Sequence, residues 1–277
     1  MRYFKIEASE VNSLEDKVFL ITGASSGIGL ATAELFLRKG ANAVVIADTE
    51  CPPEDLDSRV LYIRADVTVC DDLRLLFAAT IEKYGRIDVV FANAGIVDRS
   101  DYVSLREEDG KVLEPDRRSL DVNLSGCLNS VALQPPGGSI VMTSSGAGYF
   151  GVSSAAYRFL RAMKLQLHPH IPMRINVVAP GYTESNKTKG MVSEFRGVGL
   201  PIQPPSAVGL AVAKLVVDAS YHGHTLFVAD DQYVEMEGHL GDDTARYFGS
   251  MNGDEKQFRE LLAIMKAQME KTRRAPA

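Results

Sequence analysis

Residues 18–29 read VFLITGASSGIG, and this stretch decides the fold. Its first five residues form a short apolar run, which is typical of a strand buried on both faces. A glycine-rich turn follows, and residues 30–39 then carry apolar side chains at helical spacing. A strand, a glycine turn and a helix in this order let the backbone approach a pyrophosphate, and the helix N-terminus offers free N–H groups. The stretch therefore predicts a dinucleotide-binding turn.

A second apolar run, at 43–47, ends in Asp48, which lies 19 residues after Gly29. An acid at about this distance hydrogen-bonds the adenosine ribose hydroxyls and repels a 2′-phosphate. We therefore expect NAD as the cofactor, with NADP less favoured. The predicted cofactor-binding residues of this region are Gly23, Ser25, Ser26, Gly27, Ile28, Gly29 and Asp48.

Apolar runs and amphipathic stretches alternate along the rest of the chain. We predict further strands at 60–63, 87–91, 139–143, 174–179 and 225–229, and helices at 71–84 and 207–217. This α/β alternation predicts a single-domain, Rossmann-type, doubly wound parallel sheet with helices on both faces. The domain is expected to span residues 14–245, between an N-terminal extension (1–13) and a C-terminal helical extension (246–277).

Small and polar residues follow the ends of several predicted strands. Ligands of parallel sheets bind beyond the carboxyl ends of the strands, so we expect these residues to meet in one crevice. The stretch 183–205, after the sixth strand, is expected to form a substrate lid. The residues predicted to meet there are Asp66, Asn93, Ser144, Gly181 and Thr183. The cofactor-binding residues predicted in this part of the chain are Asp66, Val67, Asn93, Ala94, Gly95, Pro180, Gly181 and Thr183.

The composition is that of one soluble globular domain. Of the 277 residues 45% are hydrophobic and 24% are charged, and the net charge is −6. An acidic chain does not favour a nucleic-acid or anionic-membrane partner, and no apolar run reaches the roughly 20 residues that span a bilayer. Three scattered cysteines and the lack of a signal-peptide pattern indicate a reducing compartment, so we expect a cytoplasmic protein. His222 and His224 have no further ligands at metal spacing, so no metal site is predicted.

These motifs give the chain a family resemblance. It resembles the short-chain dehydrogenase/reductase family over about residues 14–240, and most closely the NAD-linked branch that includes 15-hydroxyprostaglandin dehydrogenase and fungal alcohol dehydrogenases. The matching motifs are TGASSGIG at 22–29, Asp66-Val67, Asn93-Ala94-Gly95, Asn123, Ser144, Tyr157 and PGYT at 180–183.

The resemblance implies a reaction and a set of roles. Tyr157 would act as the acid/base and contact the cofactor, Ser144 would orient the substrate oxygen, and Asn123 would anchor a proton-relay water. The substrate would be a small-molecule alcohol or ketone, and a role in secondary metabolism is one expectation.

The family has a lysine four residues after the tyrosine, where this chain has Arg161. A cation one helical turn from a phenol favours the phenolate, which otherwise forms near pH ~10. Arg161 is therefore a candidate catalytic cation, although its charge is spread over a planar fork. In a second alignment the lysine falls in a deleted segment, and Lys164 lies two turns from Tyr157. Both alignments remain open.

Two segments are shorter than the family's: 11 residues separate Asn123 from Pro135, and Asn176 follows Tyr157 by 19. Family dimers commonly pair the helices of these segments, so a homo-oligomer is possible but its interface helices are expected to be short. The sequence supports two functions. The first is an NAD(H)-dependent oxidoreductase that interconverts a secondary alcohol and a ketone. The second is an NAD-binding protein of the same fold with little or no redox activity, because the lysine is absent.

Overall fold

The computed structural model describes residues 3–12, 14–97, 107–150, 156–167, 171–185 and 188–238, with four single positions after residue 255. Most of the predicted C-terminal extension, 246–277, therefore lies outside the described residues. The predicted domain boundaries at 13 and 245 remain a prediction.

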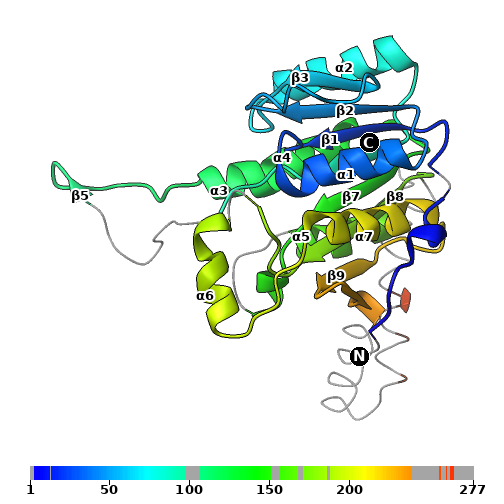
Figure 1. The fold of residues 1–277 in the computed structure, drawn as a ribbon. Helices are drawn as coiled ribbons and strands as arrows, with labels where there is room; N and C mark the ends of the chain where they lie inside the picture. The colour runs from blue at the N-terminus through cyan, green and yellow to red at the C-terminus, as the bar shows by residue number, and fades with distance from the viewer. Residues whose placement is uncertain are drawn as a thin grey trace.

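An eight-stranded sheet forms the centre of the described chain (Figure 1). Its order is β10-β9-β8-β7-β4-β1-β2-β3. Every neighbouring pair is parallel except β9 with β10, which run antiparallel. The predicted doubly wound sheet is confirmed, and the antiparallel edge strand was not predicted. The strands are β1 (Val18–Thr22), β2 (Ala43–Asp48), β3 (Val60–Arg64), β4 (Val89–Ala92), β7 (Ser139–Thr143), β8 (Arg174–Pro180), β9 (Thr225–Ala229) and β10 (Gln232–Glu235).

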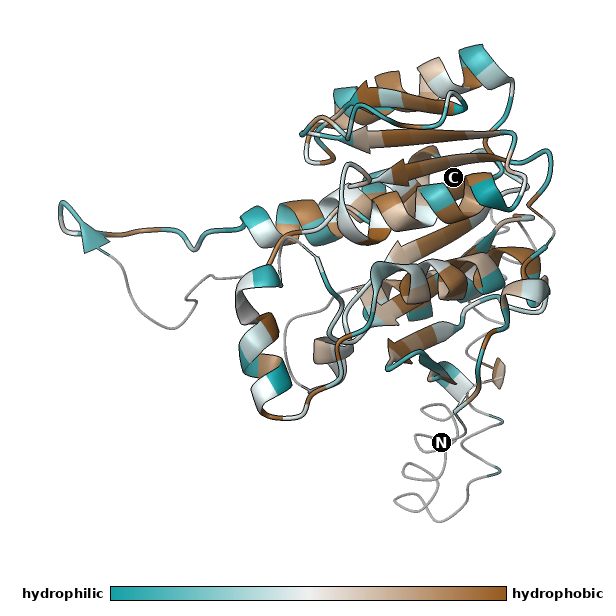
Figure 2. Ribbon diagram, in the orientation of Figure 1, coloured by the Kyte–Doolittle hydropathy of each residue, from teal (hydrophilic) through white to brown (hydrophobic). Residues whose placement is uncertain are grey.

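Helices cover both faces of the sheet, because successive strand residues point to opposite sides. On β1, Phe19 and Ile21 join the core under α1 (Gly27–Arg38) and α7 (Pro205–Val217), whereas Leu20 joins the core under α2 (Cys70–Tyr84). The second face is completed by α4 (Gly126–Leu133) and α5 (Ala156–Leu167). Figure 2 shows the matching pattern, with hydrophobic strands inside and hydrophilic residues on the outer sides of the helices.

Helix α1 begins at Gly27, three residues before the predicted start. The last residues of the glycine turn therefore form the first turn of the helix. This matters for the site, because the unpaired N–H groups of a helix N-terminus then lie within the turn itself.

The N-terminal segment packs onto the domain. Ile6 and Val11 are buried in the core of α1 and α7, and Phe4 forms a β-bridge with Tyr233 of β10. The side chain of Lys214, on α7, lies 3.1 Å from a carboxylate oxygen of Glu10. The described part of the predicted extension, residues 3–12, thus pairs with the β10 edge of the sheet through Phe4.

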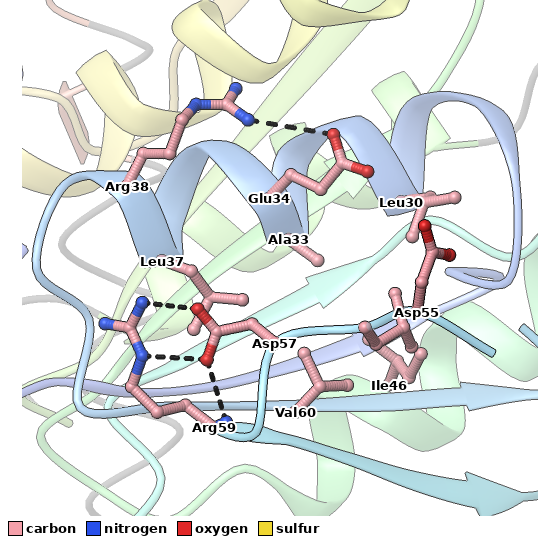
Figure 3. Close-up of a pocket in the computed structure, with 11 residues that line it drawn as sticks. Leu30, Ala33, Glu34, Leu37, Arg38, Ile46, Asp55, Asp57, Arg59 and Val60 are labelled. Atoms are coloured by element: carbon pink, nitrogen blue, oxygen red, sulfur yellow. Dashed lines mark hydrogen bonds and ion pairs between the residues drawn. The ribbon is translucent and has the colours of Figure 1, made fainter. Parts of the chain in front are cut away.

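The connection from β2 to β3, residues 49–59, contains no helix. A cavity of about 190 Å³ lies between this connection and α1 (Figure 3). Its floor is apolar, and its rim carries two ion pairs, Arg38–Glu34 and Arg59–Asp57. The cavity is lined by Leu30, Ala33, Glu34, Leu37, Arg38, Ile46, Asp55, Leu56, Asp57, Arg59 and Val60.

Two segments project from the carboxyl edge of the sheet (Figure 1). One is a hairpin of β5 (Glu107–Glu108) and β6 (Lys111–Val112), whose turn residues Asp109 and Gly110 both have positive φ. The other contains α6 (Val192–Gly197) and belongs to the predicted lid. After the hairpin, the chain forms α3 (Arg118–Leu120) and a π-helical turn (Asp121–Ser125), which lead without a break into α4.

Candidate active site

The glycine turn lies where the strand order reverses, between β1 and β4. Gly23 has φ +66°, and a Cβ there would lie 2.6 Å from the Cα of Ala94. A Cβ on Gly29 would overlap the carbonyl oxygen of Gly23. Both positions therefore require glycine, and the turn can approach a ligand as bare backbone. This cradle, with α1 starting inside it, fits a pyrophosphate.

Asp48 joins the end of β2 to the glycine turn. Its Oδ2 accepts a hydrogen bond from the backbone N–H of Ser25 (3.0 Å), and its Oδ1 accepts one from the backbone N–H of Glu50 (3.2 Å). The hydroxyl of Ser25 in turn donates to the carbonyl oxygen of Glu50 (2.6 Å). The half-buried carboxylate is thus fixed at the sheet edge where an adenosine ribose would lie.

Asn93 connects three strand ends. Its backbone N–H donates to the hydroxyl of Thr22 (3.1 Å), and its side-chain amide donates to the carbonyl oxygen of Gly23 (2.9 Å). Its Oδ1 accepts a hydrogen bond from the hydroxyl of Thr143 (3.1 Å), so β1, β4 and β7 are tied together. The backbone N–H of Ala94 also donates to Thr22. The predicted binding residue Asn93 therefore positions the crevice through its side chain.

Asn123 lies in the π-helical turn, a feature that often marks functional sites. Its amide makes a two-way contact with the backbone of Ile96: Oδ1 accepts from Ile96 N–H (2.7 Å) and Nδ2 donates to Ile96 O (2.9 Å). A Cβ on Gly95 would lie 3.2 Å from Asn123 Oδ1. The predicted motifs at 93–95 and at Asn123 are therefore in contact.

Asp66 and Val67 follow β3. The carboxylate of Asp66 accepts hydrogen bonds from the backbone N–H and hydroxyl of Thr68, at 2.8 and 2.7 Å. Val67 is buried, and a Cβ on Gly126 of α4 would lie 2.6 Å from its Cγ2. The side chain of Val67 thus belongs to the core, which leaves its backbone and Asp66 to face a ligand.

Tyr157 lies near the start of α5 and is only 5% exposed. Its hydroxyl donates a hydrogen bond to the carbonyl oxygen of Ser145. The neighbouring residue, Ser144, directly follows β7 and is held by a backbone hydrogen bond to Val178 (2.8 Å). The fold therefore brings the predicted tyrosine to the strand end that carries the predicted serine.

Arg161 extends toward the end of β10. Its Nε and one Nη atom donate to the two carboxylate oxygens of Glu237, at 2.9 and 3.0 Å. The Glu237 side chain is 5% exposed, and Thr225 also donates to it (3.3 Å). Lys164 lies 4.0 Å from the same carboxylate. Arg161, the candidate catalytic cation, and Lys164 thus both lie against the same buried carboxylate.

The segment after β8 is anchored by Gln203. The amide of Gln203, which is 2% exposed, donates to the hydroxyl of Thr183 (3.1 Å) and to the carbonyl oxygen of Val228 (2.9 Å). Gly181 N–H donates to the same Val228 oxygen (2.7 Å). The predicted residues Pro180, Gly181 and Thr183 are thereby held at the carboxyl edge of the sheet, where the predicted lid segment begins.

The predicted lid segment also approaches the glycine turn. A Cβ on Gly27 would lie 3.5 Å from the Cβ of Ser185. A crevice of about 430 Å³ separates α1 from the lid and is lined by Gly27, Leu30, Ala31, Glu34, Glu184, Ser185, Lys189 and Pro205. Sequence reasoning missed Ser185, Gln203 and Glu237. Ser185 and Gln203 could have been noticed only because they lie in the stretch 183–205 that follows the sixth predicted strand. No signal in the sequence pointed to Glu237.

The glycine turn, the acid at the end of β2 and the strand-end crevice define a dinucleotide-binding α/β protein. The described residues hold no cluster of three or more side chains that could bind a metal ion, and no helix among them is long and apolar enough to cross a membrane.

Comparison with known proteins identifies the family. The short chain dehydrogenase family profile matches residues 17–194. The short-chain dehydrogenase/reductase ascJ of Acremonium egyptiacum is 37% identical over 253 residues, which cover 84% of each chain. The chain therefore belongs to the short-chain dehydrogenase/reductase family, whose members are oxidoreductases.

Two solved structures share the fold. One is a 3-ketoacyl-(acyl-carrier-protein) reductase from Brucella melitensis complexed with NADH, with a TM-score of 0.65, 24% identity, and coverage of 78% of this chain and 98% of that one. The other is a short chain dehydrogenase from Burkholderia cenocepacia in complex with NADP, with a TM-score of 0.64, 22% identity, and coverage of 79% and 98%. The fold thus serves nicotinamide cofactors of both kinds.

Proposed function

We propose that this oxidoreductase uses NAD(H) to interconvert a secondary alcohol and the ketone of a small organic substrate. The observation that carries the proposal is the contact of Tyr157 with Ser145, which brings a phenol beside Ser144 at the sheet edge that bears the glycine turn. A positioned hydroxyl acid/base next to a hydrogen-bonding serine suits proton exchange with an alcohol oxygen.

The cofactor would be held by backbone and by one acid. The N–H groups of the glycine turn would bind the pyrophosphate, and Asp48 would bind the adenosine ribose hydroxyls. When bound, the nicotinamide ring supplies or accepts the hydride. The strand-end residues 93–95 and 180–183 would form the walls of the site.

The remaining steps belong to side chains of this chain. Tyr157 exchanges the proton of the substrate hydroxyl, Ser144 hydrogen-bonds the substrate oxygen, and Asn123 supports the relay of that proton to solvent. The contact of Asn123 with Ile96 supports this assignment, because it fixes Asn123 beside the strand-end motif at 93–95.

A second candidate is a nucleotide-binding protein of the same fold with little redox activity. The bidentate contact between Arg161 and Glu237 favours it, because a paired guanidinium does little to stabilise a phenolate. Membership of an oxidoreductase family favours the first candidate.

Turnover separates the two candidates. The full chain would be incubated with NAD and a panel of secondary alcohols, and with NADH and the matching ketones, while NADH absorbance is followed. Conversion of any member supports the proposal. NAD binding without conversion of any of them supports the second candidate.

The preference for NAD rests on Asp48. NAD(H) is expected to bind at least tenfold more tightly than NADP(H), a difference of about 1.4 kcal/mol. Fluorescence titration measures the dissociation constants of NAD(H) and NADP(H). Asp48→Ala should reduce the difference between these two constants. Equal dissociation constants in the unsubstituted protein would contradict the preference. A cytoplasmic location and a role in secondary metabolism complete the proposal. The three scattered cysteines support the location, and the resemblance to fungal alcohol dehydrogenases supports the role.

A further inference from the structure

Arg64 is the last residue of β3 and lies directly beside Asp48 in the sheet. The two residues are Cα partners in the parallel register of β2 and β3. Neighbouring strands lie about 4.8 Å apart, so both side chains start from the same short stretch of the carboxyl edge. The sequence positions alone, 16 residues apart, do not reveal this neighbourhood.

The side chain of Arg64 is tied down close to β2. Its Nε donates to the carbonyl oxygen of Thr49 (3.2 Å), the residue after Asp48. The hydroxyl of Tyr62, two residues earlier on β3, reaches the carbonyl oxygen of Asp48 (3.4 Å). The guanidinium is therefore held over the end of β2 and remains exposed to solvent.

The guanidinium has no acidic partner in the part of the chain that the structure describes: no carboxylate oxygen lies within 4.0 Å of its nitrogens. The contrast with Figure 3 is clear, since Arg38 is paired with Glu34 and Arg59 is bonded twice to Asp57. The two Nη groups of Arg64 are thus available to a ligand anion.

The negative charge of Asp48, beside Arg64, is partly compensated by hydrogen bonds. The carboxylate of Asp48 already accepts hydrogen bonds from two backbone N–H groups, those of Ser25 and Glu50. Glu50 adds a second, exposed carboxylate to the same loop. An adenosine 2′-phosphate bound here would therefore meet two acids and one available arginine.

We propose that Arg64 is a specificity-determining residue that binds the 2′-phosphate of NADP(H) and limits the discrimination that Asp48 exerts. The inference rests on the proposed nucleotide site. A guanidinium suits this task because its Nη groups form charge-assisted hydrogen bonds with phosphate oxygens. NADP(H) is then a second cofactor that the protein binds more weakly than NAD(H), through the Arg64 side chain at the end of β3.

Two nucleotide probes test the inference without turnover. Binding of 5′-AMP and of adenosine 2′,5′-bisphosphate to the full chain is measured by calorimetry at one fixed ionic strength, because exposed charges are screened by salt. Arg64→Gln should weaken the bisphosphate about tenfold, or about 1.4 kcal/mol, and 5′-AMP less than about twofold. The affinity of Arg64→Lys for the bisphosphate should lie between those of the unsubstituted protein and of Arg64→Gln.

Arg59→Gln is the matched control, because it removes the same charge from the residue just before β3, at the opposite end of the strand. It should leave both probes unchanged. If 5′-AMP binds and Arg64→Gln weakens both probes equally, or neither, the assignment of Arg64 is wrong while the nucleotide site stands. If Arg59→Gln matches Arg64→Gln, the effect is one of net charge and the assignment is again wrong. If neither probe binds the unsubstituted protein, the proposed nucleotide site fails and the inference fails with it.

Discussion

Arg161 is bonded through two nitrogens to Glu237, a buried acid 76 residues further along the chain. The contact ties α5 to the segment that follows β10. It also directs the guanidinium to a carboxylate, although Arg161 occupies the position four residues after Tyr157. The ion pair therefore has consequences for both stability and chemistry.

Glu237→Gln should lower stability by about 1–2 kcal/mol. Removing one partner of a buried pair costs more than this, but the Arg161 side chain is 43% exposed and water screens part of the loss. Chemical denaturation measures the change. The matched control is Glu10→Gln, because the carboxylate of Glu10, which pairs with Lys214, is 41% exposed and its loss should cost less stability. Equal losses in the two variants would show that burial of Glu237 adds nothing.

Arg161→Lys should leave the pH–rate profile of the alcohol oxidation unchanged. The cation at this position is engaged by Glu237, so exchanging its chemical type does not alter the surroundings of the phenol. The profile of kcat against pH, measured for both proteins, checks this expectation. A shift of its alkaline or neutral limb would instead identify Arg161 as the replacement for the family's lysine.

Tyr157→Phe should reduce kcat at least a hundredfold for any substrate that the protein converts, because the acid/base group is removed. Circular dichroism should confirm that the variant folds, since the hydroxyl also binds Ser145. Tyr3→Phe, which removes an exposed phenol, is the control. Turnover at the unsubstituted rate in Tyr157→Phe would exclude this tyrosine from the reaction.

Glu235 should make stability depend on pH in the acid range. Burial alone would raise its pKa, but hydrogen bonds from His224 and from the backbone N–H groups of Gly238 and Glu237 lower the pKa from 4.5 to about 2. A depressed native pKa stabilises the fold above about pH 4.5, and this contribution is lost as the pH falls toward 2. Glu235→Gln should therefore cost more stability at pH ~5 than at pH ~3. Urea unfolding at both values measures this, and an equal cost at both would refute it.

The predicted weak dimer depends on two short helices. Helix α4 has 8 residues and α5 has 12, and a stable interface usually buries roughly 1,200 Å² or more. A dimer through these helices should dissociate at micromolar concentration. Analytical ultracentrifugation across a dilution series measures the equilibrium. A dimer that persists at nanomolar concentration on these two helices would contradict the expectation.

The sequence by itself determined the sheet and predicted the place of the candidate site. Buried strands on a doubly wound sheet leave continuous apolar runs, and the turn at 23–29 needs glycine wherever a Cβ would strike backbone, so both features are local. The residues that meet beyond the strand ends could be named for the same reason, because parallel strands bring their carboxyl ends to one edge. The start of α1 was misplaced by three residues, since the glycines that disfavour a helix also form its first turn.

Only the tertiary structure decided what the polar side chains contact. The side-chain amide of Asn93 bonds to Gly23 and Thr143, and that of Asn123 bonds to Ile96. The guanidinium of Arg161 bonds to Glu237, and these contacts join residues 27 to 76 positions apart. The pairing of Asp48 with Arg64 depends on the register of two strands. Sequence periodicity reports which face of an element is apolar. It does not report which distant polar group a side chain reaches, because that depends on how the elements pack against one another.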